Sequence, residues 1–179
     1  MVTKGFSFNE KNSLVRLGSL SNLGGKSNSI KDDFMEMTKE TRRPKVLILA
    51  TLSGGYAGAD SVGQLHTDYP TNTYILPVLC PCMFPESFYL RCFEQGIDAI
   101  LVLYSGTDSP YKGGPERTAM LINQTYPLMK ERGIDTRRLR LAAICTVCTK
   151  PFLKEVTQMD TLLDGIGYVR DEMTSLVAV

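Results

Sequence analysis

Two closely spaced pairs of cysteines have the most specific chemistry in this sequence. Cys80 and Cys82 are separated by one residue, and Cys145 and Cys148 by two. Thiolates at these spacings suit an iron–sulfur cluster or a zinc ion, because both centres prefer soft sulfur ligands. We therefore predict that these four cysteines are the ligands of any metal that the protein binds. The alternative is that they are small buried side chains that fill space where strands end.

A glycine-rich segment follows the first predicted strand. Gly54, Gly55 and Gly58 open a helix after a strand, where free backbone N–H groups and the helix dipole attract an anion. However, Ser53 replaces the first glycine of the dinucleotide-binding pattern, and Cys80 stands where a ribose-binding carboxylate is expected. The three glycines are candidates for cofactor or phosphate binding. The alternative is a tight turn that needs small residues.

The remaining polar residues form no complete hydrolytic or group-transfer site in the sequence. His66 is the only histidine, and no serine or cysteine nucleophile lies beside it. Asp60 and Asp108 follow strands, where lone carboxylates commonly cap helices. A basic group before the fourth predicted strand indicates a solvated edge or a partner-docking surface. It consists of Arg137, Arg138 and Arg140.

Apolar segments alternate with helical segments from Pro44 onward. The predicted strands are residues 45–51, 73–80, 99–104 and 139–145. The predicted helices are residues 57–65, a segment from Pro85 to Gly96, residues 116–132, and a segment with Phe152, Val156, Met159 and Leu163 on one face. Pro127 is expected to kink the third helix or to divide it. This alternation predicts an α/β fold in which helices cover both faces of an open, four-stranded parallel sheet, a flavodoxin-like or Rossmann-like three-layer architecture.

Ligands of such sheets bind at the carboxyl ends of the strands, and the candidate residues follow those ends. The glycine segment, both cysteine pairs and residues 105–109 each come directly after a predicted strand. If the strand order is 2-1-3-4, the two cysteine pairs lie at opposite edges, about 14 Å apart at the strand ends. A shared cluster would then require both loops to bend inward.

The composition is that of one globular domain with a polar N-terminal segment. Among 179 residues, Lys plus Arg number 20 and Asp plus Glu 19, and this charge balance argues against nucleic-acid binding through phosphate neutralisation. No apolar run of about 18 residues is present, so we expect no membrane insertion. No secretory signal is visible, which predicts a cytoplasmic protein whose five cysteines are mostly not in structural disulfides.

Three regions follow from these patterns. Residues 1–43 are predicted to be an N-terminal arm that is either a loose tail or ordered on a partner surface. Residues 44–167 form the α/β domain. Residues 168–179 are a short tail, for which packing as an edge strand and docking elsewhere are the alternatives.

Four segments match a known family in their order and spacing. They are YAGADSVG at 56–63, DYPTN at 68–72, FEQGIDAILV at 93–102 and GIDTRRLR at 133–140. With these segments the chain resembles the delta, or iron–sulfur, subunit of methyl-viologen-reducing hydrogenase, which also occurs beside heterodisulfide reductase-like complexes. The resemblance covers residues 44–167. It implies a relay subunit that carries a 2Fe-2S cluster and passes electrons from a hydrogenase or formate dehydrogenase to a heterodisulfide reductase-like flavoprotein.

The family places cysteines after its first and third strands, where this chain has ATLSG at 50–54 and SGTDS at 105–109. Of the four candidate ligands only Cys80 stands at a family cysteine position. We therefore expect an accessory subunit of an oxidoreductase complex, not a self-sufficient enzyme, with a 2Fe-2S cluster, zinc or no metal as the alternatives. Two other hypotheses are a docking subunit that has lost its cofactor, and a small-molecule or phosphate-binding flavodoxin-like module.

Overall fold

The computed structural model describes residues 43–106, 109–144 and 148–177. The chain divides into two units, Met1–Arg42 and Arg43–Val179, and all described residues belong to the second unit. The predicted N-terminal arm up to residue 42, together with Asp108 and Cys145, lies outside the described residues.

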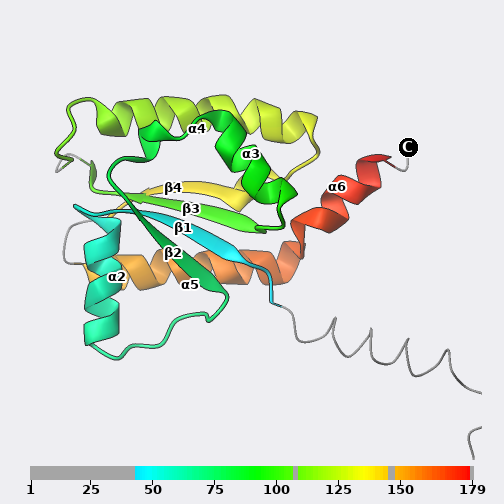
Figure 1. The fold of residues 1–179 in the computed structure, drawn as a ribbon. Helices are drawn as coiled ribbons and strands as arrows, with labels where there is room; N and C mark the ends of the chain where they lie inside the picture. The colour runs from blue at the N-terminus through cyan, green and yellow to red at the C-terminus, as the bar shows by residue number, and fades with distance from the viewer. Residues whose placement is uncertain (1–42, 107–108, 145–147, 178–179) are drawn as a thin grey trace, which may run out of the picture. The chain divides into compact units, whose positions relative to one another are not determined.

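Four parallel strands form one open sheet (Figure 1). In chain order they are β1 (Val46–Thr51), β2 (Thr73–Val78), β3 (Ala99–Tyr104) and β4 (Leu139–Ala143). Their spatial order is β2-β1-β3-β4, so β1 and β3 are central while β2 and β4 are the two edges. The predicted α/β class and open parallel sheet are confirmed. β2 and β4 end earlier than their predicted ends at residues 80 and 145.

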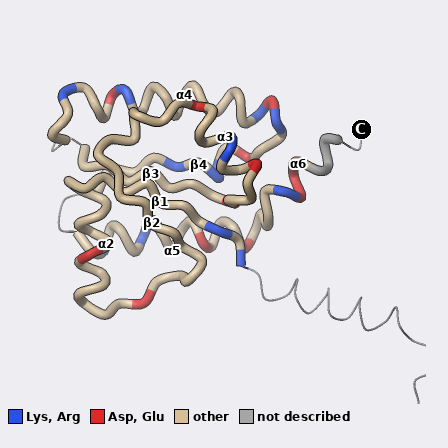
Figure 2. The backbone as a smooth tube through the Cα atoms, in the orientation of Figure 1, with Lys and Arg blue, Asp and Glu red and all other residues tan. Residues whose placement is uncertain are grey.

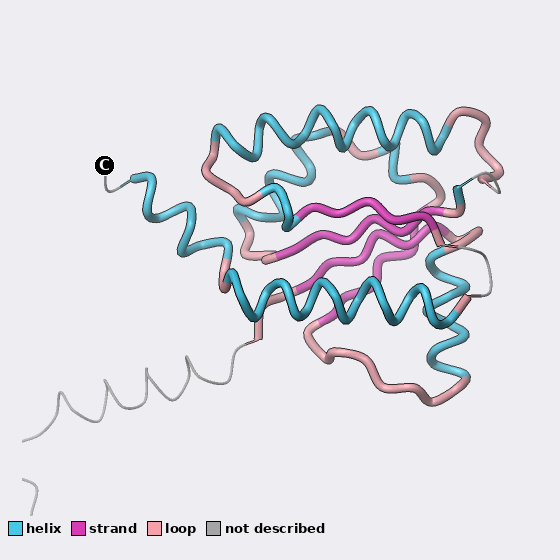
Figure 3. Tube along the Cα trace, turned by 180° about the vertical axis from the view of Figure 1, so that it is seen from behind, coloured by secondary structure: helices cyan, strands magenta, loops and turns pink. Residues whose placement is uncertain are grey.

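Helices cover both faces of the sheet, as predicted (Figure 1 and Figure 3). On one face lie α2 (Gly55–Gln64) and α5 (Thr149–Ile166), and on the other lie α3 (Glu86–Glu94) and α4 (Gly114–Glu131). Single turns of 3-10 helix precede α3 and β4, and they are η1 (Pro81–Met83) and η3 (Thr136–Arg138). Among the described helices, none is long and apolar enough to cross a membrane.

The central strands are apolar on both faces because each face meets a helical layer. In β1, Ile48 belongs to the core beneath α2 and α5, while its neighbour Leu49 belongs to the core beneath α3 and α4. In β3, Leu101 and Val102 divide in the same way. Side chains alternate between the faces of a strand, so a continuous apolar run fills two cores at once.

Of the two alternatives predicted for Pro127, division of the helix is wrong and a kink stays a prediction. α4 runs without interruption from Gly114 to Glu131 although it contains Pro127, so the proline does not divide it. Ile122 and Met129, on either side of the proline, are both buried in the same core. Their packing on the sheet offsets the hydrogen bond that a proline removes from a helix.

The C-terminal tail is a helix, not an edge strand. α6 (Val169–Val177) begins with Val169, whose side chain is completely buried against the α3 and α4 layer. The backbone N–H of Val169 donates to Oδ1 of Asp98 at 2.9 Å, and the N–H of Lys45 donates to Oδ2 of the same carboxylate at 2.8 Å. Asp98 thus ties the start of α6 to the residue just before β1.

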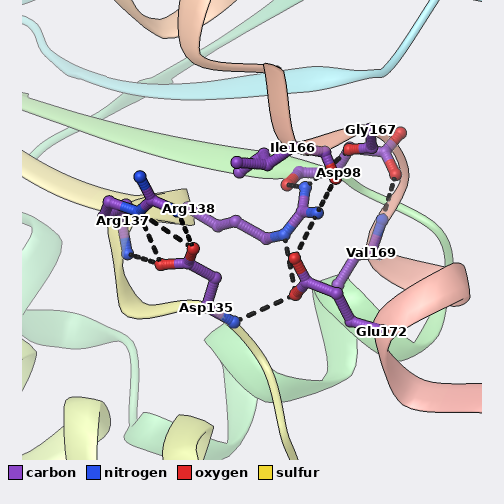
Figure 4. A network of polar contacts seen from close by, with 8 residues as sticks. All are labelled: Asp98, Asp135, Arg137, Arg138, Ile166, Gly167, Val169 and Glu172. Carbon is purple, nitrogen blue, oxygen red and sulfur yellow. Dashed lines mark hydrogen bonds and ion pairs between the residues drawn. The ribbon is translucent and has the colours of Figure 1, made fainter. Parts of the chain in front are cut away.

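Arg138 lies in the interior, which corrects the prediction of a solvated basic edge. Its side chain is 0% exposed, and its guanidinium donates two hydrogen bonds to the carboxylate of Glu172 in α6, at 2.7 and 3.1 Å (Figure 4). It also donates to three backbone carbonyls, those of Asp98, Ile166 and Gly167. This buried network connects the amino end of the sheet, the end of α5 and the start of α6.

The two neighbouring arginines also have acidic partners. Arg137 forms an ion pair with Asp135 at 2.6 Å, and Arg140 forms one with Glu155 at 3.0 Å. The side chains of both arginines are partly exposed. Arg137 and Arg140 therefore reach the surface, whereas Arg138, the third member of the predicted basic group, does not.

Candidate functional site

The turn after β1 packs closely against the end of β3, at the carboxyl edge of the sheet. Ser53 Oγ lies 2.8 Å from Ser105 Oγ, a hydrogen bond that joins the two loops. A Cβ atom at Gly54 would lie 2.8 Å from Cβ of Ser105, and one at Gly55 would lie 2.5 Å from Cβ of Leu103. Both distances are shorter than real Cβ contacts, so these two positions require glycine for packing alone.

Gly58 differs from the other two glycines. Its nearest neighbour would be Cβ of Phe152 at 3.5 Å, which is an ordinary contact. The tight turn that was the alternative to anion binding therefore accounts for Gly54 and Gly55 without a ligand. A cofactor-binding role for the three glycines stays a prediction.

Cys80 and Cys82 lie side by side immediately after β2, with their Sγ atoms 3.0 Å apart. Both thiols are free, and Cys80 is only 8% exposed while Cys82 is partly exposed. Burial raises the pKa of Cys82, and so does the hydrogen bond with Cys80, whereas the nearby positive charge of Arg117 lowers it. The burial and the hydrogen bond both favour the protonated thiol of Cys82 at neutral pH.

The first turn of α4 packs against Cys80 of this pair. Thr118 Oγ1 lies 4.0 Å from Sγ of Cys80, and its hydroxyl donates to the carbonyl of Gly114 at 2.8 Å. A Cβ atom at Gly114 would approach Sγ of Cys80 to 3.1 Å. The absence of a side chain at Gly114 therefore leaves room for the Cys80 thiol.

Cys148 lies in a different part of the fold. It is the N-cap residue of α5, and its carbonyl would be 3.6 Å from a Cβ atom at Gly58, in the α2 and α5 layer. Cys80 instead contacts α4, which covers the opposite face. Cys148 is disulfide-bonded, whereas Cys80 and Cys82 are free thiols.

The structure does not bring the described members of the predicted metal site together. β2 and β4 are opposite edges of the sheet, so the ends of these two strands are separated by three strand spacings, or about 14 Å. Within the described residues, no group of three or more His, Cys, Asp or Glu side chains is arranged to hold a metal. Cys80 and Cys82 supply two adjacent thiols, whereas a 2Fe-2S cluster needs four ligands. The four-cysteine site stays a prediction, since Cys145 is not described.

The other polar candidates do not form a catalytic arrangement. His66 is exposed just after α2 and has a positive φ of 50°. Asp60 accepts a hydrogen bond from Nε2 of Gln64 one turn along the same exposed helix face, at 2.6 Å. Asp60 belongs to α2, on the face of the sheet opposite to α4, which contacts Cys80.

Comparison with known families decides the assignment. Residues 46–167 match the family described as methyl-viologen-reducing hydrogenase, delta subunit. The chain belongs to this family. The match confirms the resemblance and covers nearly the same residues as the expected range of 44–167.

Relatives of this delta-subunit domain are of two lengths. The chain is 25% identical over 130 residues to an iron-sulfur subunit of the F420-non-reducing hydrogenase of Archaeoglobus profundus, covering 72% of this chain and 94% of the relative. It is 23% identical over 125 residues to the vhu iron-sulfur subunit of the F420-non-reducing hydrogenase of Methanocaldococcus jannaschii, 69% and 93% of the two chains. It is 28% identical over 119 residues to one subunit of the ferredoxin:CoB-CoM heterodisulfide reductase of Methanosarcina mazei. That match covers 66% of this chain and 15% of the relative.

Sequence reasoning missed an exposed apolar surface on the delta-subunit domain. β2 carries Tyr74 and Leu76, which are 52% and 40% exposed and pair with Leu47 and Leu49 of β1, so they lie on the α3 and α4 face of the sheet. Leu79 and Met83, which follow β2, are 55% and 62% exposed. We call these four residues the β2 surface. A signal was present in the sequence, because no charged residue occurs in the segment 69–85 (Figure 2).

Proposed function

We propose that this chain is an accessory component of a multisubunit redox complex, and that its partner resembles the long heterodisulfide reductase subunit to which it is similar. The observation that carries the proposal is the way in which the domain matches its relatives. It corresponds to almost the whole of small hydrogenase subunits and to a 15% segment of the much longer heterodisulfide reductase subunit. A domain that is part of a long chain in one protein and separate in another is expected to bind the remainder of that chain.

The β2 surface supports docking as the role of the domain. Exposed apolar side chains on one face of a strand commonly mark protein–protein interfaces, and Tyr74 and Leu76, two residues apart in β2, lie on one face. Here Tyr74, Leu76, Leu79 and Met83 occur in a segment without charges, on a strand whose outer edge is unpaired among the described residues. We therefore place the contact with the heterodisulfide reductase-like partner on the β2 surface.

The test is binding of the full chain to a coexpressed heterodisulfide reductase-like partner. Leu76→Lys puts a charge into the β2 surface, and we expect at least about a tenfold weaker Kd, or about 1.4 kcal/mol. Met120→Lys is the matched control, because Met120 is 58% exposed on α4 and lies outside the β2 surface. Equal affinities of the two variants would remove the β2 surface from the interface, and no binding by the wild type would overturn the proposed partner.

A 2Fe-2S relay is a second candidate for the function of the same chain. The 3.0 Å separation of the Cys80 and Cys82 thiols favours it, since adjacent thiolates can bind one iron. Its ligands would be Cys80, Cys82, Cys145 and Cys148, and the disulfide at Cys148 weighs against that set. Iron and acid-labile sulfide of about two per chain in anaerobically purified protein, with visible absorption, would establish the relay. Colourless protein that still binds its partner would leave docking as the function.

A further inference from the structure

The cysteine pair after β2 has a geometry that docking does not explain. The two Sγ atoms are 3.0 Å apart, only about 1 Å more than a disulfide bond. Pro81 lies between the cysteines and restricts the backbone of the segment. The N–H of Met83 donates to the carbonyl of Cys80 at 3.2 Å, closing the turn that brings the side chains together. The two sulfur atoms therefore need to approach by only about 1 Å to reach the bond length of a disulfide.

The two thiols differ in their access to solvent. Cys80 is buried against Thr118, whereas Cys82 is partly exposed in the turn η1. Thiol–disulfide exchange needs one accessible sulfur to attack an incoming disulfide and a second sulfur beside it to resolve the adduct. Cys82 fits the role of the attacking sulfur, and Cys80 fits the role of the resolving sulfur.

The surroundings also indicate the kind of disulfide that would react. Arg117 is exposed in the first turn of α4, next to Thr118, whose Oγ1 lies 4.0 Å from Sγ of Cys80, so its positive charge is near the cysteine pair. A guanidinium at this place attracts carboxylates on an approaching molecule. Small disulfides that carry carboxylates, such as oxidised glutathione, therefore suit the site.

We propose that Cys80 and Cys82 are a redox-active dithiol that reduces small carboxylate-bearing disulfides and closes to an intramolecular disulfide. Cys82 first releases its proton to solvent; the thiolate then attacks one sulfur of R–S–S–R, this S–S bond breaks, Cys82–S–S–R forms, and the first R–S⁻ leaves and takes up a proton. Cys80, as thiolate, then attacks Sγ of Cys82, and the second R–S⁻ leaves and is protonated. The protein loses two electrons and two protons, and one disulfide becomes two thiols.

The experiment uses the reduced full chain, incubated with oxidised glutathione, alkylated and digested with trypsin. Cys80 and Cys82 are the only cysteines in the tryptic peptide 46–91, so their state is read separately from that of the other three. In the wild type we expect this peptide to lose two hydrogens and to resist alkylation, with reversal by dithiothreitol. Cys80→Ser should trap glutathione on Cys82. Cys82→Ser should reduce the glutathione adduct at least about tenfold, because Cys80 is buried.

Two further variants make the outcome decisive. Cys92→Ser changes a half-buried thiol outside the pair and should behave as the wild type does. Leu76→Lys, which is expected to lose the partner, should keep the thiol chemistry, so failure of this proposal is distinguishable from failure of the docking function. A wild-type peptide that stays reduced, or that accumulates the glutathione adduct without closing to the disulfide, would overturn the proposal.

Discussion

Replacing Arg138 by methionine tests whether the buried network holds α6 to the domain. Methionine keeps much of the volume of the side chain but removes all of its donors. Three backbone carbonyls and the carboxylate of Glu172 then lose the hydrogen bonds from Arg138, while Glu172 still accepts one from the N–H of Asp135 at 3.0 Å. Breaking a buried ion pair by removing one partner typically costs about 3–5 kcal/mol. Glu172 is 25% exposed, so water can solvate it partly, and we expect about 3 kcal/mol.

Urea unfolding followed by circular dichroism measures this loss. With a slope of about 2 kcal/mol per M, the midpoint should fall by about 1.5 M. Arg137→Met is the matched control, because Arg137 has a 63% exposed side chain and pairs with Asp135 at the surface. An exposed pair contributes at most about 1 kcal/mol, so the control midpoint should move by about 0.5 M or less.

A second measurement detects local loss of α6. Trypsin cleavage after Arg170, within α6, should become faster in Arg138→Met if the helix detaches before the sheet unfolds. Equal urea midpoints for Arg138→Met and Arg137→Met, together with unchanged cleavage after Arg170, would refute the role given to the network.

The remaining predictions concern the glycine turn and the surface ion pair. Gly55→Ala should destabilise the domain by about 1–3 kcal/mol, because the added Cβ atom overlaps Leu103. Gly58→Ala has room for the Cβ atom and should be neutral or stabilising by up to about 1 kcal/mol. Similar urea midpoints for the two variants would contradict the packing explanation. The hydrogen bond from the Arg137 side chain lowers the pKa of Asp135 in the folded state. The contribution of the Asp135 carboxylate to the free energy of unfolding should therefore be present above the ordinary pKa of an aspartate. It should be lost as the pH falls toward the lowered pKa of the folded state. Asp135→Asn should flatten this part of a pH series of urea midpoints, and an unchanged slope would exclude Asp135 as the titrating group.

The sequence determined the elements and their class because local patterns encode them. Continuous apolar runs such as residues 99–104 indicated strands buried on both faces, and β3 has these bounds. Pro85 and Gly96 correctly marked the ends of the α3 segment. The family also followed from the sequence, since four segments retained their order and spacing.

Only the tertiary structure decided what several residues of these segments do. Asp98 and Arg138 both occur in segments that carried the family resemblance, but sequence distance hid that the backbone carbonyl of Asp98 accepts a hydrogen bond from Arg138 in one buried network. Arg138 looked like a surface charge because its partner Glu172 lies in a tail that was too short to be recognised as a helix. Burial of a charge depends on partners from distant segments, which no local pattern specifies.

The candidate site also has one part that the sequence determined and one part that only the tertiary structure decided. The spacing of Cys80 and Cys82 showed their proximity directly, because neighbours in a turn meet whatever the rest of the fold does. The relation of this pair to Cys148 depended on strand order and on which face each loop joins, and both are set by long-range packing. The need for glycine at Gly54 and Gly55 likewise comes from the side chains of β3 and the loop after it, about 50 residues away in the chain, which only the folded chain brings into contact.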